Sequence, residues 1–335
     1  MKAVFTAMGD GTFLERVYDS TARAILAKRL DFIPPFISME ELERGNTEWK
    51  DVEFFFSTWG TPQLNQEQLE RYFPRLQAVF YAAGSVQNFA RPYLERGIRI
   101  FSAADANAVP VIEFTTAEII LANKGFFQSA RLYSAGRRPE ARQYAFAFPG
   151  NYDTPVGIIG AGKIGSGVIR RLKEYRLDVK VFDPFLKAED ARELGAEKID
   201  TLEELFKNCL VISNHLANNE QTQKMLNYRH FSLMWDYGVF INTGRGAQVV
   251  EDDLVRALTE KPSRTAVLDV TFPEPVPEGH PFYTMDNVIL TPHIAGSNGM
   301  EVKRMGMYMA EEFERYITGS PLRYEVTLEK LATMA

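Results

Sequence analysis

The stretch from Val156 to Asp183 constrains the fold of this chain most strongly, and it reads VGIIGAGKIGSGVIRRLKEYRLDVKVFD. A short apolar run is followed by Gly160, Gly162 and Gly165, then by helical periodicity, a second apolar run and an acid. This order predicts a β-α-β unit. The first glycine permits a tight turn, the second lets backbone approach a ligand, and the third lets the helix pack close on the strand.

A unit of this kind predicts a dinucleotide site. The helix N-terminus offers unpaired N–H groups to a pyrophosphate. The carboxylate of Asp183 can accept hydrogen bonds from the ribose diol of NAD, and it would repel the 2′-phosphate of NADP. The alternative is a plain tight turn in which Asp183 only starts the turn at Pro184. The complete order of strand, glycines, helix, strand and acid favours NAD as the cofactor.

The bulk properties exclude several classes of protein. The 335 residues are enough for two domains, and 45% hydrophobic with 24% charged residues is ordinary for a soluble globular protein. A net charge of −6 without a block of basic residues argues against a nucleic-acid partner. No run approaches the roughly 20 apolar residues that span a bilayer, so we expect no membrane association. One cysteine, Cys209, excludes an internal disulfide and predicts a cytoplasmic location. We predict no metal site.

Short apolar runs alternate with helical runs through the first hundred residues and again from Pro155 to about Ala295. This alternation predicts α/β domains with doubly wound parallel sheets. One helix is expected over Phe13–Leu30. A second is expected over Val109–Tyr133, followed by a polar connecting arm over Ser134–Thr154. The second helix is apolar enough to need another surface, which is either the core of one subunit or a dimer interface.

Three chemically active side chains follow three neighbouring predicted strands. They are Arg245, Glu274 and His293. Ligands of open α/β sheets bind at the carboxyl ends of strands, so we expect these residues to share a site. An arginine can hold a substrate carboxylate or polarise a carbonyl, and a histidine can give a proton to a carbonyl oxygen. A carboxylate beside the histidine stabilises the imidazolium. The trio suits reduction of a 2-oxo acid.

With these residues in place, the chain resembles the D-isomer-specific 2-hydroxyacid dehydrogenase family. The strongest matches are VGIIGAGKIGSGV at 156–168, VFINTGRGAQVVEDDLVRAL at 239–258, VLDVTFPEPVP at 267–277 and VILTPHIAGS at 288–297. Weaker matches are YAAGS at 81–85 and NAVPVIEFT at 107–115. Together the segments run across most of the chain, and the set is far more specific than any one of them.

The resemblance implies roles for individual residues. It makes Arg245, Glu274 and His293 catalytic. Substrate carboxylate contacts are implied for the backbone N–H groups of Ala83 and Gly84, together with Arg245. The implied cofactor-binding positions are Gly160, Gly162, Lys163, Ile164, Gly165, Asp183, His215, Thr243 and Asp269.

The resemblance also implies an organisation. A flavodoxin-like substrate domain is expected from both chain ends, residues 1–105 plus 296–335. A Rossmann NAD-binding domain is expected over 106–295, including a helical dimerisation arm at about 109–154. The family further implies a homodimer and an active site in the cleft between the domains.

The implied function is transfer of a hydride between NAD(H) and a small 2-oxo or D-2-hydroxy acid. Two departures from the family pattern leave the substrate open. Val86 stands where the family usually has Asp, and the segment His215-Leu216-Ala217 lacks a usual proline. One alternative is a non-enzymatic NAD(H)-sensing protein, of the kind that acts as a corepressor. Another is the formate dehydrogenase branch, in which the histidine needs no glutamate partner, so Glu274 favours hydroxy-acid chemistry.

Overall fold

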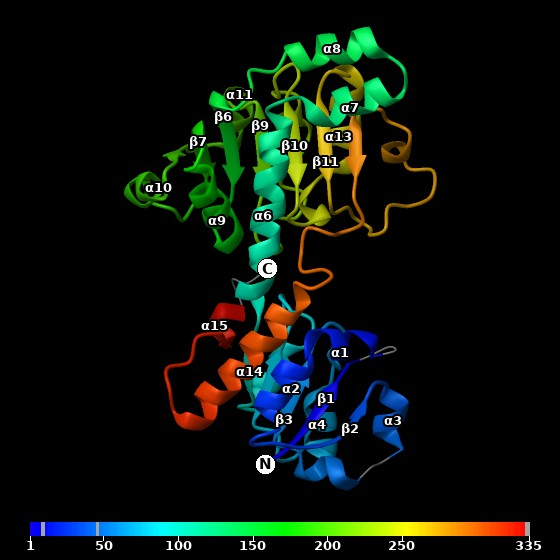
Figure 1. Ribbon diagram of the computed structural model, residues 1–335, viewed down its shortest axis with the longest axis vertical. Coiled ribbons are helices and arrows are strands. Elements are labelled where there is room, and N and C mark those ends of the chain that lie inside the picture. Colours follow the sequence, from blue (N-terminus) through cyan, green and yellow to red (C-terminus); the bar gives the residue numbers. More distant parts are fainter. Residues whose placement is uncertain (8–10, 45–46, 332–335) are drawn as a thin grey trace. The chain divides into compact units, whose positions relative to one another are not determined.

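The computed structural model describes residues 1–7, 11–44 and 47–331. The chain divides into two compact units, residues 1–109 with 297–335 and residues 110–296. Each unit is built on its own sheet with helices on both faces (Figure 1). The predicted fold class, α/β with two doubly wound domains, is confirmed. In the ranges described, no helix is both long and apolar enough to cross a membrane.

The first unit contains a six-stranded sheet in the order β13-β5-β4-β3-β1-β2. All neighbouring strands are parallel except β13, which pairs antiparallel with β5. The strands are β1 Lys2–Thr6, β2 Asp31–Phe36, β3 Phe54–Ser57, β4 Ala78–Tyr81, β5 Arg99–Ser102 and β13 Glu325–Val326. The helices are α1 Thr12–Val17, α2 Ser20–Leu26, α3 Met39–Glu43, the 3₁₀ helix η1 Thr47–Asp51, α4 Gln66–Tyr72, α5 Ala90–Glu95, α14 Val302–Thr318 and α15 Leu328–Leu331.

Successive side chains along the strands of this sheet point to opposite faces, so the sheet contributes to two hydrophobic cores. Phe54 and Phe56 pack on the face covered by α1, α2 and α14, whereas Phe55 faces α4 and α5. The single helix predicted over Phe13–Leu30 is wrong, because the chain forms α1 and α2 instead. Asp19 separates them, since its side chain accepts hydrogen bonds from the first turn of α2.

The second unit contains a seven-stranded parallel sheet in the order β12-β11-β10-β9-β6-β7-β8. Its order reverses between β6 and β9, which is where doubly wound sheets bind ligands. The strands are β6 Tyr152–Ile159, β7 Arg176–Phe182, β8 Glu197–Lys198, β9 Val211–Asn214, β10 Val239–Asn242, β11 Thr265–Leu268 and β12 Val288–Leu290. The helix α6 Ala104–Ala122 begins in the first unit and continues into the second. The other helices of the second unit are α7 Phe126–Ser134, α8 Arg138–Phe146, α9 Lys163–Leu172, α10 Ala188–Leu194, α11 Leu202–Asn208, α12 Tyr228–Phe231 and α13 Glu251–Glu260, with 3₁₀ helices η2 Gly246–Gln248 and η3 Pro281–Tyr283.

Helices cover both faces of this sheet (Figure 1). α6 and α9 share one core with the strands, and α11, α12 and α13 share the other. The single helix predicted over Val109–Tyr133 is wrong. The chain breaks between α6 and α7 because Gly125 adopts a left-handed backbone with φ of 63°. The predicted connecting arm over Ser134–Thr154 also contains a helix, α8.

Candidate functional site

The glycine loop after β6 has the geometry of a phosphate cradle. Gly160 has φ of 86°, and a Cβ there would lie 2.8 Å from the carbonyl oxygen of His215. A Cβ on Gly165 would collide with the carbonyl oxygen of Gly160, so only glycine lets α9 approach this closely. Gly162 caps the N-terminus of α9 and has open space beside it. The loop therefore suits a pyrophosphate at a helix N-terminus.

Asp183 lies directly after β7 and faces this loop. Its Oδ2 accepts a hydrogen bond from the backbone N–H of Ala161 at 2.8 Å. Its Oδ1 accepts from the N–H groups of Phe185 and Leu186 at 2.8 and 3.2 Å. The carboxylate thus connects the glycine loop to the end of β7 and also opens the turn at Pro184. It remains half-buried, so a ribose can still reach it.

Three further predicted cofactor positions lie near the loop. Lys163 and Ile164 form the first turn of α9, where Lys163 is exposed and Ile164 half-buried. The imidazole of His215, after β9, is buried, and its Nε2 lies 2.9 Å from the Oγ of Ser213. Burial lowers the pKa of His215 to about 3, so the ring is neutral at ordinary pH.

Arg245 follows β10 and is held by a network of amides. Asn214 and Asn242 end neighbouring strands, and the side-chain N–H of Asn214 donates to Oδ1 of Asn242 at 3.0 Å. Asn242 in turn donates to the carbonyl oxygen of Arg245 at 3.2 Å, and Arg245 donates to that of Gly244 at 2.7 Å. Burial lowers the pKa of Arg245, and the negative charge of Glu274 partly opposes this. The guanidinium stays charged and is poorly solvated, which strengthens its attraction for an anion.

His293 and Glu274 form a hydrogen-bonded pair. Nδ1 of His293 donates to Oε1 of Glu274 at 2.7 Å, and both side chains remain partly exposed. With Nδ1 engaged, Nε2 is the ring nitrogen left to meet a ligand. His293 has a left-handed backbone with φ of 54°, which costs a non-glycine residue roughly 1 kcal/mol or more. Strain of this kind is typical of functional positions.

Asp269, at the end of β11, holds the loop that carries His293. Its carboxylate accepts hydrogen bonds from Oγ1 of Thr291 at 2.6 Å, from the N–H of Ile294 at 2.8 Å and from the N–H of Ala295 at 2.9 Å. The N–H of His293 itself donates to the Asp269 carbonyl at 3.0 Å. Asp269 was predicted only as a cofactor contact. Its hydrogen bonds also fix the backbone that presents His293.

Ala83 and Gly84, two of the three residues predicted to hold the substrate carboxylate, lie in the first unit, shortly after β4. The carbonyl oxygens of Ala83 and Gly84 both accept from Oγ of Ser102, at 3.1 and 2.6 Å. Oγ1 of Thr58, after β3, donates to the carbonyl of Ala82 at 3.0 Å. These bonds fix the backbone of a loop made of small residues.

Sequence reasoning missed several residues that lie beside the predicted site residues. Thr115 on α6 shares a 2.8 Å hydrogen bond with Thr243, a predicted cofactor position. Asn214 and Asn242 could have been found from the sequence, because each is a polar residue at the end of an apolar strand. Thr115 and Glu118 could not have been found in this way, since both lie within a helix whose sequence looks like that of an ordinary apolar helix.

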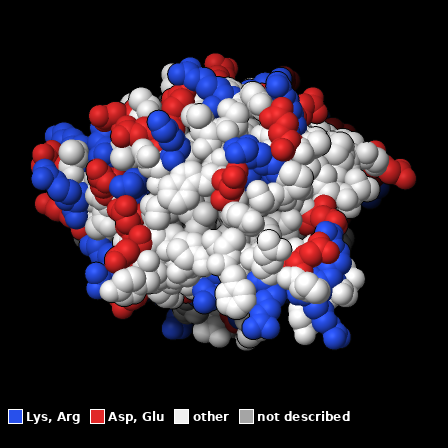
Figure 2. All heavy atoms as spheres, turned by 90° about the horizontal axis from the view of Figure 1, so that it is seen from above, with Lys and Arg blue, Asp and Glu red and all other residues white. Residues whose placement is uncertain are grey.

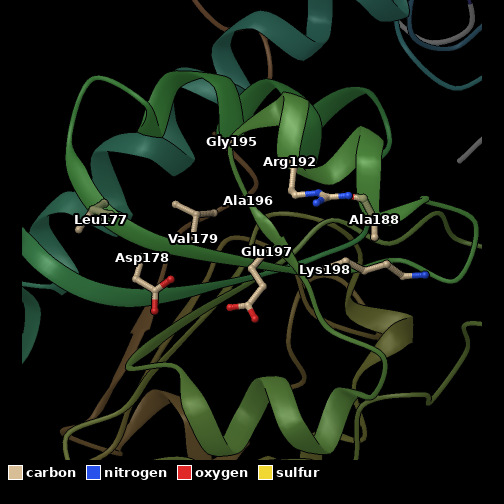
Figure 3. A pocket seen from close by; sticks show the side chains of 9 residues that line it. All are labelled: Leu177, Asp178, Val179, Ala188, Arg192, Gly195, Ala196, Glu197 and Lys198. Atoms are coloured by element: carbon tan, nitrogen blue, oxygen red, sulfur yellow. The ribbon is translucent and has the colours of Figure 1, made fainter.

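A separate hollow lies along the sheet edge at β7, β8 and α10 (Figure 3). Its lining includes acids and bases together, Asp178, Glu197, Arg192 and Lys198, and contains none of the predicted site residues. Because acidic and basic side chains line it together, the hollow favours neither an anionic nor a cationic ligand. Within the described ranges, no group of three or more His, Cys, Asp or Glu side chains can hold a metal ion.

Comparison with known proteins shows which family and which fold the chain resembles. Residues 116–295 match the family described as D-isomer specific 2-hydroxyacid dehydrogenase, NAD binding domain. D-3-phosphoglycerate dehydrogenase of Methanocaldococcus jannaschii is 29% identical over 81% of this chain and 51% of its own length. Formate dehydrogenase of Neurospora crassa is 30% identical over 81% of this chain and 75% of its own length.

The chain thus spans about half the length of the phosphoglycerate dehydrogenases that it matches. Among solved structures, apo D-mandelate dehydrogenase of Rhodotorula graminis superposes with a TM-score of 0.82 at 19% identity. The superposition covers 97% of each chain, and it shows a shared fold. The relatives are named for different substrates, so they leave the substrate of this chain open.

Proposed function

The chain belongs to the D-isomer specific 2-hydroxyacid dehydrogenase family, and from this premise we propose that it interconverts a small 2-oxo acid and its D-2-hydroxy acid. NAD is the cofactor. The observation that carries the proposal is the 2.7 Å pair of His293 and Glu274. Arg245 belongs to the same strand-end edge, because the charge of Glu274 acts on its guanidinium.

Each member of the trio has a distinct task in this proposal. Arg245 holds the substrate carboxylate or polarises the adjacent carbonyl through its forked donors. Nε2 of His293 gives a proton to the carbonyl oxygen during reduction and takes it back during oxidation. Glu274 orients the ring through its hydrogen bond with Nδ1, which leaves Nε2 directed at the substrate.

The cofactor has a matching place in the same unit. The glycine loop and the start of α9 would hold its pyrophosphate, and Asp183 its ribose. When bound, NADH supplies the hydride that reduces the substrate carbon. His293 supplies the proton, so the reaction balances as 2-oxo acid, NADH and a proton giving 2-hydroxy acid and NAD⁺.

An activity panel tests the proposed reaction. We expect the purified protein to oxidise NADH with at least one of glyoxylate, pyruvate, hydroxypyruvate, 2-oxo-4-methylpentanoate and phenylpyruvate. Chiral chromatography should then identify a D-hydroxy acid where the product is chiral. NADPH should serve poorly. Absorbance at the nicotinamide band follows each reaction.

The same panel, extended by formate with NAD⁺ and by a measurement of NADH binding, separates the alternatives. Reduction of NAD⁺ by formate, without reduction of any 2-oxo acid, would assign the chain to formate chemistry. Tight NADH binding without turnover of any substrate would favour the NAD(H)-sensing role. The His293–Glu274 pair argues for the hydroxy-acid reaction, because formate oxidation leaves no carbonyl oxygen to protonate.

We further propose that the protein is a homodimer formed through α7 and α8. Phe126 and Tyr133 on α7 are 47% and 60% exposed, and Phe146 on α8 is 75% exposed. Figure 2 views the molecule from above and shows a broad area of residues other than Lys, Arg, Asp and Glu, which a few charged side chains interrupt. Large exposed aromatic residues on neighbouring helices are typical of a protein–protein contact.

Analytical ultracentrifugation tests the dimer. The wild-type protein should sediment at roughly twice its chain mass of 38.0 kDa. Phe146→Asp should shift it towards the monomer, because the substitution puts a charge into an apolar contact. Phe185→Asp is the matched control, since Phe185 is 89% exposed but lies after β7, away from these helices. A monomeric wild type would contradict the proposal.

The cytoplasmic location stays a prediction. Cys209 is free and buried, and burial raises the pKa of its thiol to about 12. It therefore behaves as a small apolar side chain rather than a reactive thiol. A free cysteine of this kind is compatible with a reducing compartment.

A further inference from the structure

One face of α6 is directed at the strand ends that carry the predicted site. Thr115 makes the 2.8 Å hydrogen bond to Thr243 after β10. Glu118 follows three residues later, which places it on the same face of the helix. Its charge interacts with that of Asp269 after β11. The threonine thus contacts one predicted cofactor position, and the glutamate on the same helix face is close enough to a second for the two charges to influence each other.

Glu118 is an unusual residue for such a place. The residue is only 6% exposed, and its Oε2 is buried without a hydrogen-bond partner in the chain described here. Glutamates are almost never buried to this extent unless they are paired. No cation compensates Glu118 among the described ion pairs. The charge that acts on it is the negative one of Asp269, and burial with this charge raises its pKa to about 8.

The other charged groups on α6 and at the neighbouring strand ends have partners elsewhere. Glu113, on α6 itself, is exposed and pairs with Arg171 of α9 at 3.3 Å. Arg245, after β10, donates to the carbonyl of Gly244 and interacts with Glu274. Asp269, after β11, is the ionisable group that acts on Glu118. An ionised Glu118 would therefore face a second carboxylate inside the protein.

That second carboxylate is the one that holds the His293 loop. Asp269 accepts hydrogen bonds from Thr291, Ile294 and Ala295, so any displacement of it is passed to the loop. The loop already contains the left-handed residue His293, and it needs these bonds to keep that conformation. Repulsion between two carboxylates in a poorly solvated interior is strong.

We propose that Glu118 is a positioning residue that acts through Asp269, keeping the His293 loop and the neighbouring cofactor positions in order while it is uncharged and disturbing both once it ionises. The inference concerns cofactor binding first. Its consequence for turnover rests on the proposed function. Glu118 itself transfers no proton to substrate in this proposal.

Titration of cofactor affinity against pH tests the inference. NADH binding to the wild-type protein is measured by fluorescence between pH 6.5 and pH 9.5. We expect the Kd for NADH to rise roughly tenfold per pH unit above about pH 8, as binding becomes linked to protonation of Glu118. Glu118→Gln cannot ionise, so its Kd should stay nearly constant over the same range. Glu118→Met, of similar length and also uncharged, should behave as Glu118→Gln does.

Glu113→Gln is the matched control, because it removes a carboxylate from the exposed face of the same helix. It should reproduce the wild-type profile. Identical profiles for the wild type and Glu118→Gln would overturn the inference, whether or not any 2-oxo acid is reduced. A profile that flattens in Glu118→Gln would support it even if the proposed substrate class proved wrong.

Thermal unfolding supplies a second readout with a defined sign. The folded pKa of Glu118, about 8, lies above its ordinary value of 4.5. Between these two values the unfolded chain releases a proton that the folded protein keeps, so rising pH favours unfolding. Relative to the wild type, Glu118→Gln should therefore gain in Tm from about pH 5 to pH 8. A constant Tm difference across this range would contradict the assigned protonation state.

Discussion

Replacing His293 with alanine should lower kcat for reduction of a 2-oxo acid by about 10²–10⁴-fold, the usual effect of losing a positioned general acid. The affinity for NADH should change little, because the glycine loop and Asp183 belong to other strands. The loss follows from the geometry of the pair. Nδ1 is bonded to Glu274 at 2.7 Å, and Nε2 is the nitrogen that can reach a carbonyl oxygen. Single-turnover kinetics with NADH in excess measures the effect on the chemical step.

A matched histidine controls for nonspecific effects. His280 also lies near a glutamate, with its Nε2 3.8 Å from Glu251, and its Nδ1 accepts a hydrogen bond from the N–H of Phe282. Asparagine can replace that acceptor, so His280→Asn should keep wild-type turnover. Full turnover in His293→Ala would remove His293 from the mechanism.

The role of Glu274 can be tested by comparing the loss of activity in two single variants with the loss in the double variant. Glu274→Gln alone should slow the reaction less than His293→Ala, since it removes orientation and charge but leaves the acid. In the double variant, the loss should equal that of His293→Ala alone, because Glu274 acts only through the ring. A double variant with two fully additive losses would show that Glu274 acts on the substrate independently.

The fold class was predictable because it depends on local rules, and so was the placement of Arg245, Glu274 and His293 after three neighbouring strands. The strand–glycine–helix order of the second unit is dictated by steric demands on Gly160 and Gly165, which act within one turn. Strands of a parallel sheet all end at the same edge, so residues that follow β10, β11 and β12 are brought together by topology alone. Arg245, Glu274 and His293 follow those strands.

Other features depend on contacts between distant segments. The strand β2 contains Pro34 and Pro35 and has little local strand signal, yet it forms because an edge strand tolerates missing N–H groups. Asp269 has local partners, but its role in fixing His293 requires the conformation of the loop after β12. Glu118 is one of several polar residues in α6, and its sequence position does not predict that it is buried.

Asp183 combines the two roles that its sequence position allowed with a third that was not predicted, the bond to the glycine loop. Its place after the second strand of the motif predicts a contact with the cofactor ribose. The structure adds hydrogen bonds from Ala161, Phe185 and Leu186 to the same carboxylate. A substitution at this position therefore affects both the cofactor preference and the glycine loop, and an experiment must separate the two.

Replacing Asp183 with asparagine should raise the ratio of kcat/KM with NADPH to that with NADH by about 10–100-fold. A hydrogen bond from the ribose to a charged acceptor contributes about 1.5–3 kcal/mol to binding. NADH loses this contribution when asparagine replaces the carboxylate. The affinity for NADPH should rise, because the negative charge that repels its 2′-phosphate is removed. Asparagine keeps one acceptor oxygen for the N–H groups of Phe185 and Leu186, whereas alanine would leave both without a partner.

The ratio, rather than either affinity alone, is the informative measurement. Loss of the hydrogen bond to Ala161 would loosen the glycine loop. This would weaken the binding of both cofactors equally, so the effect would cancel in the ratio. Asp178→Asn is the matched control, because Asp178 lies on the same strand β7 and pairs with Lys180 at 3.1 Å. It should leave the ratio at its wild-type value. An unchanged ratio in Asp183→Asn, with both cofactors weakened, would reduce Asp183 to the residue that starts the turn at Pro184.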